Sequence, residues 1–329
     1  MAQIPKQIRA VRVHQHGDAD ALVLEKVPLR EPGAGEALVR VEAAGVNFID
    51  VYKRTGLYPI QLPSTLGEEG AGTVAAVGSD VTAVRIGDRV AWASVLGSYA
   101  EYAIIPADRL VPLPEDITSE QAAALMLQGM TAHYLAHSTY PLHQDDVCLV
   151  HAAAGGVGLL LVQIAKKRGA FVIGTAGSRE KADLARIAGA DEVIVYTTQD
   201  FVAETKRITS NKGVQVVYDS VGKTTFLQGL DVLAPRGIMV LYGGSSGPVD
   251  PIDPMVLNRK GSLFLTRPTL GHYVSTRQEL LARAQDLFDW LSIGELSLRI
   301  DSTFSLDAVS DAHRALEGRL TKGKVLIVP

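Results

Sequence analysis

A glycine-rich segment that follows an apolar run carries the clearest chemical signal in the sequence. Residues 147–150 predict a buried strand, and Gly155 and Gly158 follow at the spacing of a Gly-x-Gly-x-x-Gly fingerprint. In that fingerprint the second glycine lets the backbone approach a pyrophosphate, and the third lets the helix pack on the strand. Ala153 stands in the first place, which weakens the match. Helix amides from Gly156 onward would face the phosphates. An ordinary packing turn is the alternative.

A second chemical signal comes from the end of the next predicted strand. A site that prefers NAD places an acidic residue about twenty positions beyond the glycines, where it bonds the ribose. Residues 175–181 contain no carboxylate before Glu180 but include Ser178, Arg179 and Lys181. Hydroxyl and cationic donors suit a 2′-phosphate, which a carboxylate would repel. We therefore favour NADPH over NADH. The alternative is an ordinary helix start with Ser178 as its N-cap.

Alternating strands and helices must position these residues. Apolar strand patterns recur after the glycine segment, and helical patterns separate them. This alternation predicts an α/β fold with a doubly wound parallel sheet and a ligand crevice at the strand carboxyl ends. The four further predicted strands cover residues 171–175, 192–196, 214–219 and 238–242.

The chain before this sheet has a different pattern. Up to about residue 114, short β-rich pieces are broken by Gly and Pro, which predicts a compact, partly open β domain. Residues 119–137 have helical spacing, with Thr118 or Ser119 as the cap. Gly129 interrupts this pattern, and we expect the helix to break there, on the passage into the nucleotide domain.

The C-terminal part is expected to return to the first domain. Residues 276–293 predict a long amphipathic helix, residues 307–317 a shorter one, and residues 324–328 a last strand. No internal repeat is apparent.

Bulk properties limit the function. The length of 329 residues allows two domains, and the net charge of −4 with scattered Lys and Arg argues against nucleic acid as a partner. Cys148 is the single cysteine, so an intrachain disulfide is excluded, and we expect it to be a small core residue. No apolar run reaches roughly 18 residues, so we expect no membrane span. Residues 1–13 lack an apolar stretch typical of a signal peptide, which favours the cytoplasm.

Several separated motifs in a fixed order resemble one family. The chain is similar, over essentially its whole length, to the zinc-free quinone oxidoreductases of the medium-chain dehydrogenase/reductase superfamily, the group that includes zeta-crystallin. The motifs are residues 45–52 (GVNFIDVY), 56–59 (GLYP), 66–72 (LGEEGAG), 151–158 (HAAAGGVG), 217–222 (VYDSVG) and 263–268 (LFLTRP).

The resemblance implies an architecture and a set of partners. It implies a GroES-like catalytic domain of residues 1–128 and 268–329, and a Rossmann NADPH-binding domain of residues 129–267. It also implies NADPH in the cleft, a small-molecule quinone as substrate and usually a homodimer.

The resemblance also implies roles for individual residues. Asn47 and Tyr52 should lie by the nicotinamide, Tyr134 near the cofactor, and Arg319 should reach it from the C-terminal segment. The pyrophosphate should meet Gly155, Gly156 and Val157, and the 2′-phosphate should lie among Gly177, Ser178, Lys181 and Tyr196. Ser220, Val221 and Gly244 should line the cofactor cleft. Without a ligand role, Tyr52 and Tyr134 would be core-edge aromatics, and Asn47 a turn-stabilising side chain.

The sequence argues against a catalytic zinc ion. Zinc-dependent relatives have a Cys near the position of Asn47 and a His in a Gly-His-Glu segment, where this chain has Gly67, Glu68 and Glu69. A catalytic zinc site needs about three protein ligands and an open position. We expect Glu68 and Glu69 to be capping or solvated groups, and the alternative is that they bind a harder cation than zinc. His133 and His137 are four positions apart and could share one helix face, but two ligands make an incomplete site.

The remaining chemistry favours quinone reduction. Without a Lewis acid, alcohol oxidation lacks its usual stabilisation of an alkoxide, whereas a quinone delocalises the charge that it gains. NADPH would supply the reducing equivalents, and Tyr52 is the candidate to donate a hydrogen bond or proton to the quinone oxygen. Whether one or two electrons are transferred stays open. The alternatives are a reductase of activated carbon–carbon double bonds, such as enals or enones, and a noncatalytic, crystallin-like NADPH-binding protein.

Overall fold

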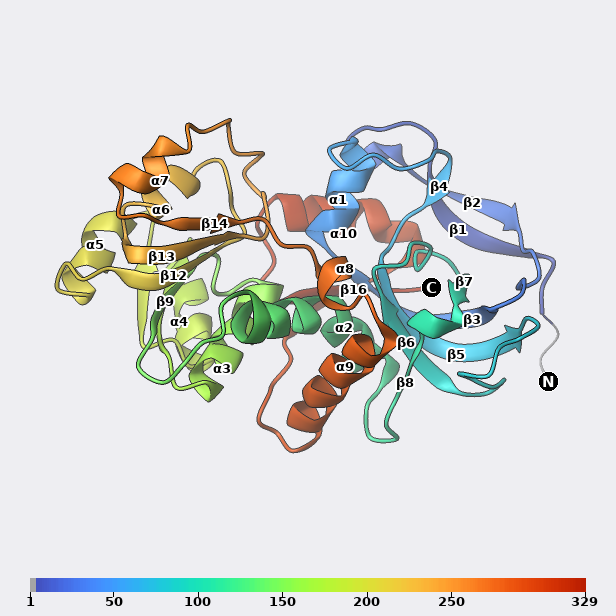
Figure 1. The fold of residues 1–329 in the computed structure, drawn as a ribbon. Coiled ribbons are helices and arrows are strands. Elements are labelled where there is room, and N and C mark those ends of the chain that lie inside the picture. Colours follow the sequence, from blue (N-terminus) through green and yellow to red (C-terminus); the bar gives the residue numbers. More distant parts are fainter. Residues whose placement is uncertain (1–3) are drawn as a thin grey trace. The chain divides into compact units, whose positions relative to one another are not determined.

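The chain divides into two units, which we describe separately. The computed structural model describes residues 4–329 (Figure 1). The first unit runs up to Met130 and resumes at Val274–Pro329, and the second is Thr131–Tyr273. Among the described residues, no helix combines the length and the apolar character needed to cross a bilayer.

A six-stranded parallel sheet forms the second unit. Its strand order is β11-β10-β9-β12-β13-β14, which is the 3-2-1-4-5-6 order of a Rossmann fold (Figure 1). The strands are β9 (Val147–Val150), β10 (Phe171–Ala176), β11 (Glu192–Val195), β12 (Val214–Asp219), β13 (Leu233–Leu241) and β14 (Phe264–Thr266). The predicted doubly wound parallel sheet is thereby confirmed.

Helices alternate with or follow these strands. They are α3 (Gly156–Lys167), α4 (Arg179–Ile187), α5 (Phe201–Ile208), α6 (Phe226–Gly229), α7 (Met255–Arg259) and α8 (Leu270–Tyr273). The core of this unit contains Leu149, Ile173 and Val217 from three neighbouring strands. Cys148 is fully buried in β9, where burial raises the pKa of its thiol to about 12, and it is the core residue that the sequence predicts.

Two antiparallel-rich sheets form the first unit. One has the order β2-β1-β4, and the other has the order β15-β16-β3-β5-β6-β8, with β7 paired to β3. The strands are β1 (Gln7–Val13), β2 (Leu22–Pro28), β3 (Glu36–Val46), β4 (Ser64–Thr65), β5 (Glu69–Val77), β6 (Arg89–Ala93), β7 (Tyr102–Pro106), β8 (Val111–Pro112), β15 (Ile300–Ser305) and β16 (Lys324–Val328). As expected, the C-terminal strand returns, and it pairs with β3.

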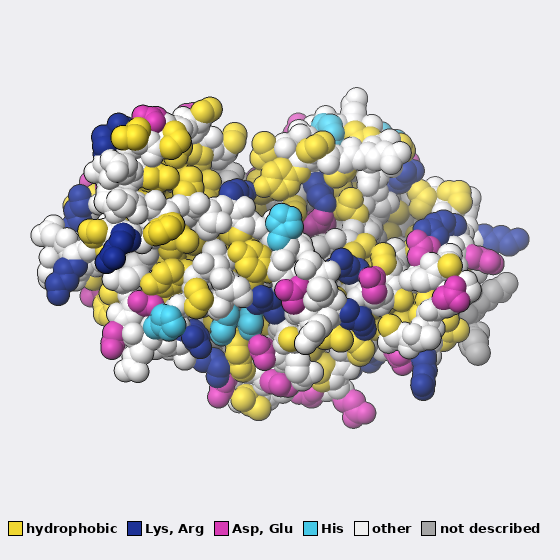
Figure 2. Space-filling view, in the orientation of Figure 1, with side chains coloured by type: hydrophobic (Ala, Val, Ile, Leu, Met, Phe, Trp, Pro, Cys, Tyr) yellow, Lys and Arg dark blue, Asp and Glu magenta, His cyan; other side chains and the backbone are white. Residues whose placement is uncertain are grey.

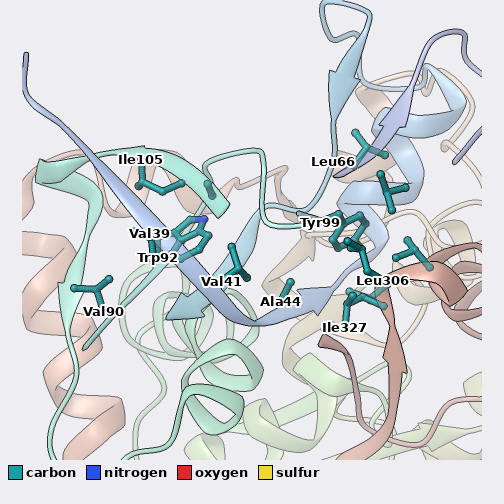
Figure 3. Close-up of a cluster of buried hydrophobic side chains, with 14 of the residues drawn as sticks. Val39, Val41, Ala44, Leu66, Val90, Trp92, Tyr99, Ile105, Leu306 and Ile327 are labelled. Carbon is teal, nitrogen blue, oxygen red and sulfur yellow. The ribbon is translucent and has the colours of Figure 1, made fainter. Parts of the chain in front are cut away.

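Helices of the first unit include one that the sequence pattern did not predict. This is α1 (Phe48–Thr55), which has Asn47 as its N-cap and Gly56 as its C-cap. The others are α2 (Ser119–Tyr134), which continues past the unit boundary, α9 (Arg277–Ser292) and α10 (Val309–Glu317). Figure 3 shows the core of this unit, in which Val39 and Val41 of β3 lie among Trp92, Tyr99 and other buried side chains.

The expected helix break at Gly129 is wrong. Helix α2 runs through Gly129 to Tyr134, and Thr118 caps it by accepting a hydrogen bond from the Gln121 amide at 3.2 Å. A Cβ on Gly129 would lie 2.8 Å from Leu125 Cδ1 and 3.1 Å from Leu287 Cδ1. The glycine therefore serves close side-chain packing. The irregularity comes later, as a π-helical turn at Leu135–Thr139.

Candidate active site

The glycine-rich turn lies between the carboxyl end of β9 and the start of α3. Ala152 adopts a positive φ of 52°, and Gly155 then stands as the extended N-cap of α3 without a side-chain capping bond. The first amides of an α-helix have no acceptor within the helix. The amides from Gly156 onward therefore form a helix N-terminus that suits the charge of a pyrophosphate.

Two glycines make the turn possible. A Cβ on Gly158 would overlap the Ala152 carbonyl oxygen and lie 2.9 Å from the Ala153 carbonyl carbon. A Cβ on Gly174, in the neighbouring strand β10, would lie 2.9 Å from Ala153 Cβ. Gly174 thus leaves the room that Ala153 needs. This explains why alanine can occupy the first position of the fingerprint.

A cluster of polar groups lies at the carboxyl ends of β10 and β11. A Cβ on Gly177 would lie 2.7 Å from the Tyr196 hydroxyl, so these two residues approach closely. Ser178 Oγ accepts a hydrogen bond from the Lys181 amide at 3.2 Å and caps α4. The structure therefore brings Gly177, Ser178, Lys181 and Tyr196 together. Ser178 is an N-cap, as the alternative interpretation held, and its contact with a phosphate stays a prediction.

The loops after β12 and β13 are held against each other. Asp219, which is buried at the end of β12, accepts a hydrogen bond from the Val221 amide at 2.7 Å. The Ser245 amide donates to the Ser220 carbonyl at 3.1 Å, and Gly244 directly precedes Ser245. Ser220, Val221 and Gly244 thus lie together at the carboxyl edge of the sheet, where Rossmann folds bind their ligands.

Tyr134 and Arg319 have very different surroundings. The Tyr134 side chain is buried, and its ring stacks on Tyr273 with ring centroids 4.2 Å apart. The Tyr273 hydroxyl accepts a hydrogen bond from Thr139 at 3.0 Å. Arg319 is exposed in the first unit, where it follows α10 with a φ of 57°. Asn47 and Tyr52 also belong to the first unit, so the contacts expected of these three residues with the cofactor stay predictions.

Asn47 lies at the centre of a buried network. Its side-chain Nδ2 donates to the Gly45 carbonyl at 3.3 Å and to Glu69 Oε2 at 2.9 Å. Its Oδ1 accepts from Gln128 Nε2 and Lys324 Nζ, both at 3.0 Å. A primary amide offers two donor hydrogens and two acceptor lone pairs. All four are engaged, so an amide contact with a nicotinamide requires that one of these bonds be exchanged.

Glu68 and Glu69 are not solvated, and our expectation for them was wrong. Glu69 is fully buried, where its Oε1 accepts from the Leu127 amide at 2.5 Å and its Oε2 pairs with Lys324. Glu68 is also buried and pairs with Lys53. Burial lowers the pKa of Lys324, and the neighbouring Glu69 opposes that change. The sequence interpretation missed the pair of Glu69 and Lys324 because these residues are 255 positions apart.

Asp50 fixes the start of helix α1. Its carboxylate accepts hydrogen bonds from the Asn47 amide at 2.9 Å, the Glu68 amide at 3.2 Å and the Tyr99 hydroxyl at 3.1 Å. Complete burial raises the pKa of Asp50 to about 7, against the opposing effect of these donors and of Lys324. Asp50 thereby joins α1 to the loop before β5.

A directed chain of hydrogen bonds leads from Asp50 to the surface. Arg54 Nη1 lies 3.1 Å from His313 Nδ1, and because a guanidinium has only donors, Nδ1 is the acceptor. His313 Nε2 then carries the hydrogen and donates to Tyr99, 3.2 Å away, which in turn donates to Asp50. Arg54 pairs with Glu317. Because Arg54 does not release protons, this chain holds α1 in place and is no proton conduit.

Tyr52 lies on a half-buried aromatic surface of α1. Its ring centroid lies 5.3 Å from that of Tyr58 and 6.1 Å from that of Phe48. The Tyr58 amide donates to the Tyr52 carbonyl at 3.0 Å, which fixes the loop after the helix against it. Aromatic faces of this kind stack on flat conjugated molecules. Tyr52 therefore adds a hydroxyl group to a cluster that it forms with Phe48 and Tyr58.

The donor set of the described residues does not fit a catalytic zinc ion. Among residues 4–329, no three His, Cys, Asp or Glu side chains are placed to hold a metal. Asn47 is hydrogen-bonded to Glu69, and Glu68 is ion-paired with Lys53, so both side chains are engaged within the protein. His133 and His137 share one face, as predicted, and their rings stack with centroids 4.2 Å apart. Two stacked histidines remain short of a zinc site.

Comparisons with known proteins agree with this architecture. The family "Alcohol dehydrogenase GroES-like domain" matches residues 33–115, and "Zinc-binding dehydrogenase" matches residues 156–288. The quinone oxidoreductase of Pseudomonas aeruginosa is 45% identical over 98% of this chain and 99% of its own length. Quinone oxidoreductase 1 of Escherichia coli is 44% identical over 97% of this chain and 99% of its own length. The chain belongs to the quinone oxidoreductase family.

Solved structures and a further relative extend the comparison. The crystal structure of the Escherichia coli quinone oxidoreductase complexed with NADPH has a TM-score of 0.96 and 44% identity, and it covers 98% of this chain and 100% of that one. A mycobacterial protein complexed with NADPH has a TM-score of 0.95 and 45% identity with the same coverage. The 2-haloacrylate reductase of a Burkholderia species is 42% identical over 98% of this chain and 99% of its own length. This family member therefore shares a scaffold with more than one reductase.

Proposed function

We propose that the chain catalyses the NADPH-dependent reduction of quinones without a catalytic zinc ion. One observation carries the proposal. The carboxyl ends of β9 and β10 combine an uncapped helix start with the Ser178, Lys181 and Tyr196 cluster, and no acidic residue stands between Thr175 and Arg179. This arrangement fits a pyrophosphate and a 2′-phosphate. Close relatives are quinone oxidoreductases, and two similar structures contain NADPH.

Each group of site residues has a proposed part in holding the cofactor. Bound NADPH supplies the reducing equivalents, and the protein binds and orients it. In this proposal residues 129–267 form the cofactor domain, and residues 1–128 and 268–329 form the catalytic domain. The cofactor residues are Asn47, Tyr52, Tyr134, Gly155, Gly156, Val157, Gly177, Ser178, Lys181, Tyr196, Ser220, Val221, Gly244 and Arg319.

Tyr52 is the proposed catalytic residue. Its hydroxyl donates a hydrogen bond or a proton to the quinone oxygen, and the rings of Phe48 and Tyr58 complete a surface on which a flat acceptor stacks. The network of Asn47 and Asp50 fixes the first turn of the helix that carries Tyr52. The protein thus contributes orientation and a proton donor, while the cofactor contributes the redox chemistry.

Acceptor panels test the reaction class. Steady-state NADPH oxidation is measured with a graded series of quinones and with a matched series of enals and enones. Higher kcat/KM for quinones supports the proposal. Preference for enones would favour the second candidate, a reductase of activated carbon–carbon double bonds, which the similarity to a 2-haloacrylate reductase supports. Tight NADPH binding with no turnover of any acceptor would instead indicate a noncatalytic, crystallin-like binding protein.

Lys181→Ala tests the choice of cofactor. The variant should raise the Kd for NADPH roughly tenfold and leave the Kd for NADH nearly unchanged, because a charge-assisted hydrogen bond to the 2′-phosphate is lost. Fluorescence titration with both cofactors measures this difference. Lys206→Ala, at an exposed lysine of α5, is the matched control. Equal penalties for the two cofactors would reject Lys181 as the phosphate contact.

We also propose that the chain forms a homodimer through β14. This strand is the edge of the six-stranded sheet, and Phe264 and Leu265 on it are 59% and 39% exposed. Figure 2 shows exposed hydrophobic side chains over this part of the molecule. An open, apolar strand edge suits pairing with a second copy. Sedimentation of Phe264→Glu should show a monomer, whereas an unchanged dimer would place the interface elsewhere. A cytoplasmic location stays a prediction.

Nucleic acid is not among the proposed partners. The net charge is −4, and on the face that Figure 2 shows, Lys and Arg side chains are interspersed with Asp and Glu. A binder of the phosphate backbone concentrates basic residues on one face or along one helix.

A further inference from the structure

The buried side chain of Lys324 lies at the centre of the catalytic-domain network. Lys324 begins β16, and its side chain is 3% exposed. Its ammonium donates to Asn47 Oδ1 at 3.0 Å and to Glu69 Oε2. A Cβ on Gly45 would lie 2.5 Å from Lys324 Nζ and overlap Glu69 Oε2. The backbone of β3 thus closes directly over the ion pair, and a glycine is needed there.

The charges of this network balance around the ammonium. Glu69 is fully buried, and a buried carboxylate is stable only when it is paired and hydrogen-bonded. Lys324 supplies the cation, with electrostatic support from Asp50 on α1. Tyr99, which also lies in the field of Asp50 and Glu69, is neutral because burial and these carboxylates raise its pKa. Lys324 is therefore the cation that directly contacts both Glu69 and Asn47.

The ammonium of Lys324 contacts the residue that caps the helix of the proposed catalytic tyrosine. Asn47, the N-cap of the helix that carries Tyr52, accepts a hydrogen bond from this ammonium. We propose that Lys324 is the fixed internal cation of this centre, which positions Asn47 and, through it, the first turn of the helix that carries Tyr52. Lys324 is thus a positioning residue, assigned from geometry. This inference rests on the proposed function, because its consequence is read in quinone turnover.

The path from Lys324 to Tyr52 is short. Asn47 is the N-cap of α1, and its amide is held by Asp50 in the first turn. Tyr52 lies on the same helix, directly after this capped first turn. Loss of the ammonium leaves Asn47 Oδ1 with one donor, from Gln128, and leaves Glu69 as a buried anion without its cation. Both changes act on the first turn of α1.

Variants that remove one or both charges of the Lys324–Glu69 pair test whether Lys324 acts through its charge. Lys324→Met keeps an unbranched apolar stem and removes the charge, Glu69→Gln removes the opposite charge, and the double variant removes both. Each single variant leaves one member of the Lys324–Glu69 pair charged without the other, and the double variant leaves neither of them charged. Replacing both members of a buried ion pair is often tolerated, whereas removing one is strongly destabilising. The coupling between the two sites is the quantity to measure.

The expected outcome is a rescue in turnover. Lys324→Met should lower kcat for quinone reduction roughly 10²-fold through misplacement of the catalytic group, with little change in the Kd for NADPH. The double variant Glu69→Gln/Lys324→Met should recover kcat by roughly tenfold or more relative to Lys324→Met. Lys322→Met, two positions earlier and half-buried, is the control for the loss of a nearby lysine.

Two results would overturn the inference. Equal losses in Lys324→Met and in the double variant would mean that the charge balance between Lys324 and Glu69 does not position α1, and an unchanged kcat in Lys324→Met would mean that Lys324 positions nothing. If the wild-type protein reduces no quinone, the proposed function fails instead. The network is then still tested by thermal unfolding, where Lys324→Met should lower Tm and the double variant should restore part of it.

Discussion

The two units contain candidate sites whose polar groups are satisfied in opposite ways. At the glycine-rich turn of the second unit, the start of α3 lacks a side-chain cap, and its first amides can donate hydrogen bonds to a ligand. In the first unit, every donor and acceptor of the Asn47 side chain is engaged by other protein groups. The difference indicates that the two regions have different functions. One region is arranged to receive an anionic ligand, and the other is arranged to hold its own geometry.

Gly158→Ala should give the largest effect, and it tests whether the glycine-rich turn of the second unit receives an anionic ligand. The new Cβ would overlap the Ala152 carbonyl oxygen, so the turn must change shape and misplace the amides of α3. We expect the Kd for NADPH to rise roughly 10³-fold, which corresponds to about 4 kcal/mol. Isothermal titration measures this change. Gly45→Ala is the counterpart in the first unit, and it should lower Tm while leaving the Kd for NADPH nearly unchanged.

Tyr52→Phe should give the next largest effect, and it tests whether the first unit contributes to turnover rather than to NADPH binding. The variant keeps the aromatic ring beside Phe48 and Tyr58 but removes the hydroxyl group. We expect kcat with quinones to fall roughly 10²-fold, the usual scale of a lost proton donor, with little change in the Kd for NADPH. Stopped-flow single turnovers measure the chemical step directly. Unchanged turnover would remove Tyr52 from the mechanism.

The same contrast explains what the sequence could and could not predict. The glycine-rich turn and the Ser178 cluster depend on residues close together along the chain, and their patterns predicted the strand, turn and helix correctly. The network around Asn47 joins residues up to 277 positions apart, so no local pattern reveals it. The motifs of the family resemblance indicated that Asn47 matters. They did not indicate its partners.

Two local errors have related physical causes. Gly129 was expected to break a helix because glycine has low helix propensity, but packing against Leu125 and Leu287 requires it within α2. Glu68 and Glu69 were expected to be capping or solvated because isolated carboxylates are seldom buried. For Gly129 and Glu69 a distant part of the chain, Leu287 and Lys324 respectively, decides the role of the residue. Tertiary contacts therefore override the local preference.

The pH dependence of stability gives the smallest expected effect, and it tests the buried hydrogen-bond network of the first unit. Burial beside Arg54 lowers the pKa of His313 from its usual 6.5 to about 3. The unfolded chain therefore binds this proton at higher pH than the folded protein does. The contribution of neutral His313 to the free energy of unfolding is fully present above about pH 6.5 and is lost as pH falls toward 3.

His313→Gln isolates that contribution. Glutamine can still accept from Arg54 and donate to Tyr99, but it does not titrate. The free energy of unfolding, measured by denaturant titration at about pH 5 and about pH 8, should depend less on pH in the variant than in the wild type. An identical pH dependence in both proteins would show that His313 takes up its proton equally in the folded and unfolded states.

Quinone-dependent NADPH oxidation before and after metal removal tests the central claim most directly. The protein is dialysed against a strong chelator, its zinc content is measured, and kcat is compared with that of the untreated protein. Because Lys324 supplies the cation beside Asn47 and Glu69, we predict that the zinc-free protein retains its full turnover. Loss of turnover on chelation, with recovery on addition of Zn²⁺, would contradict the account.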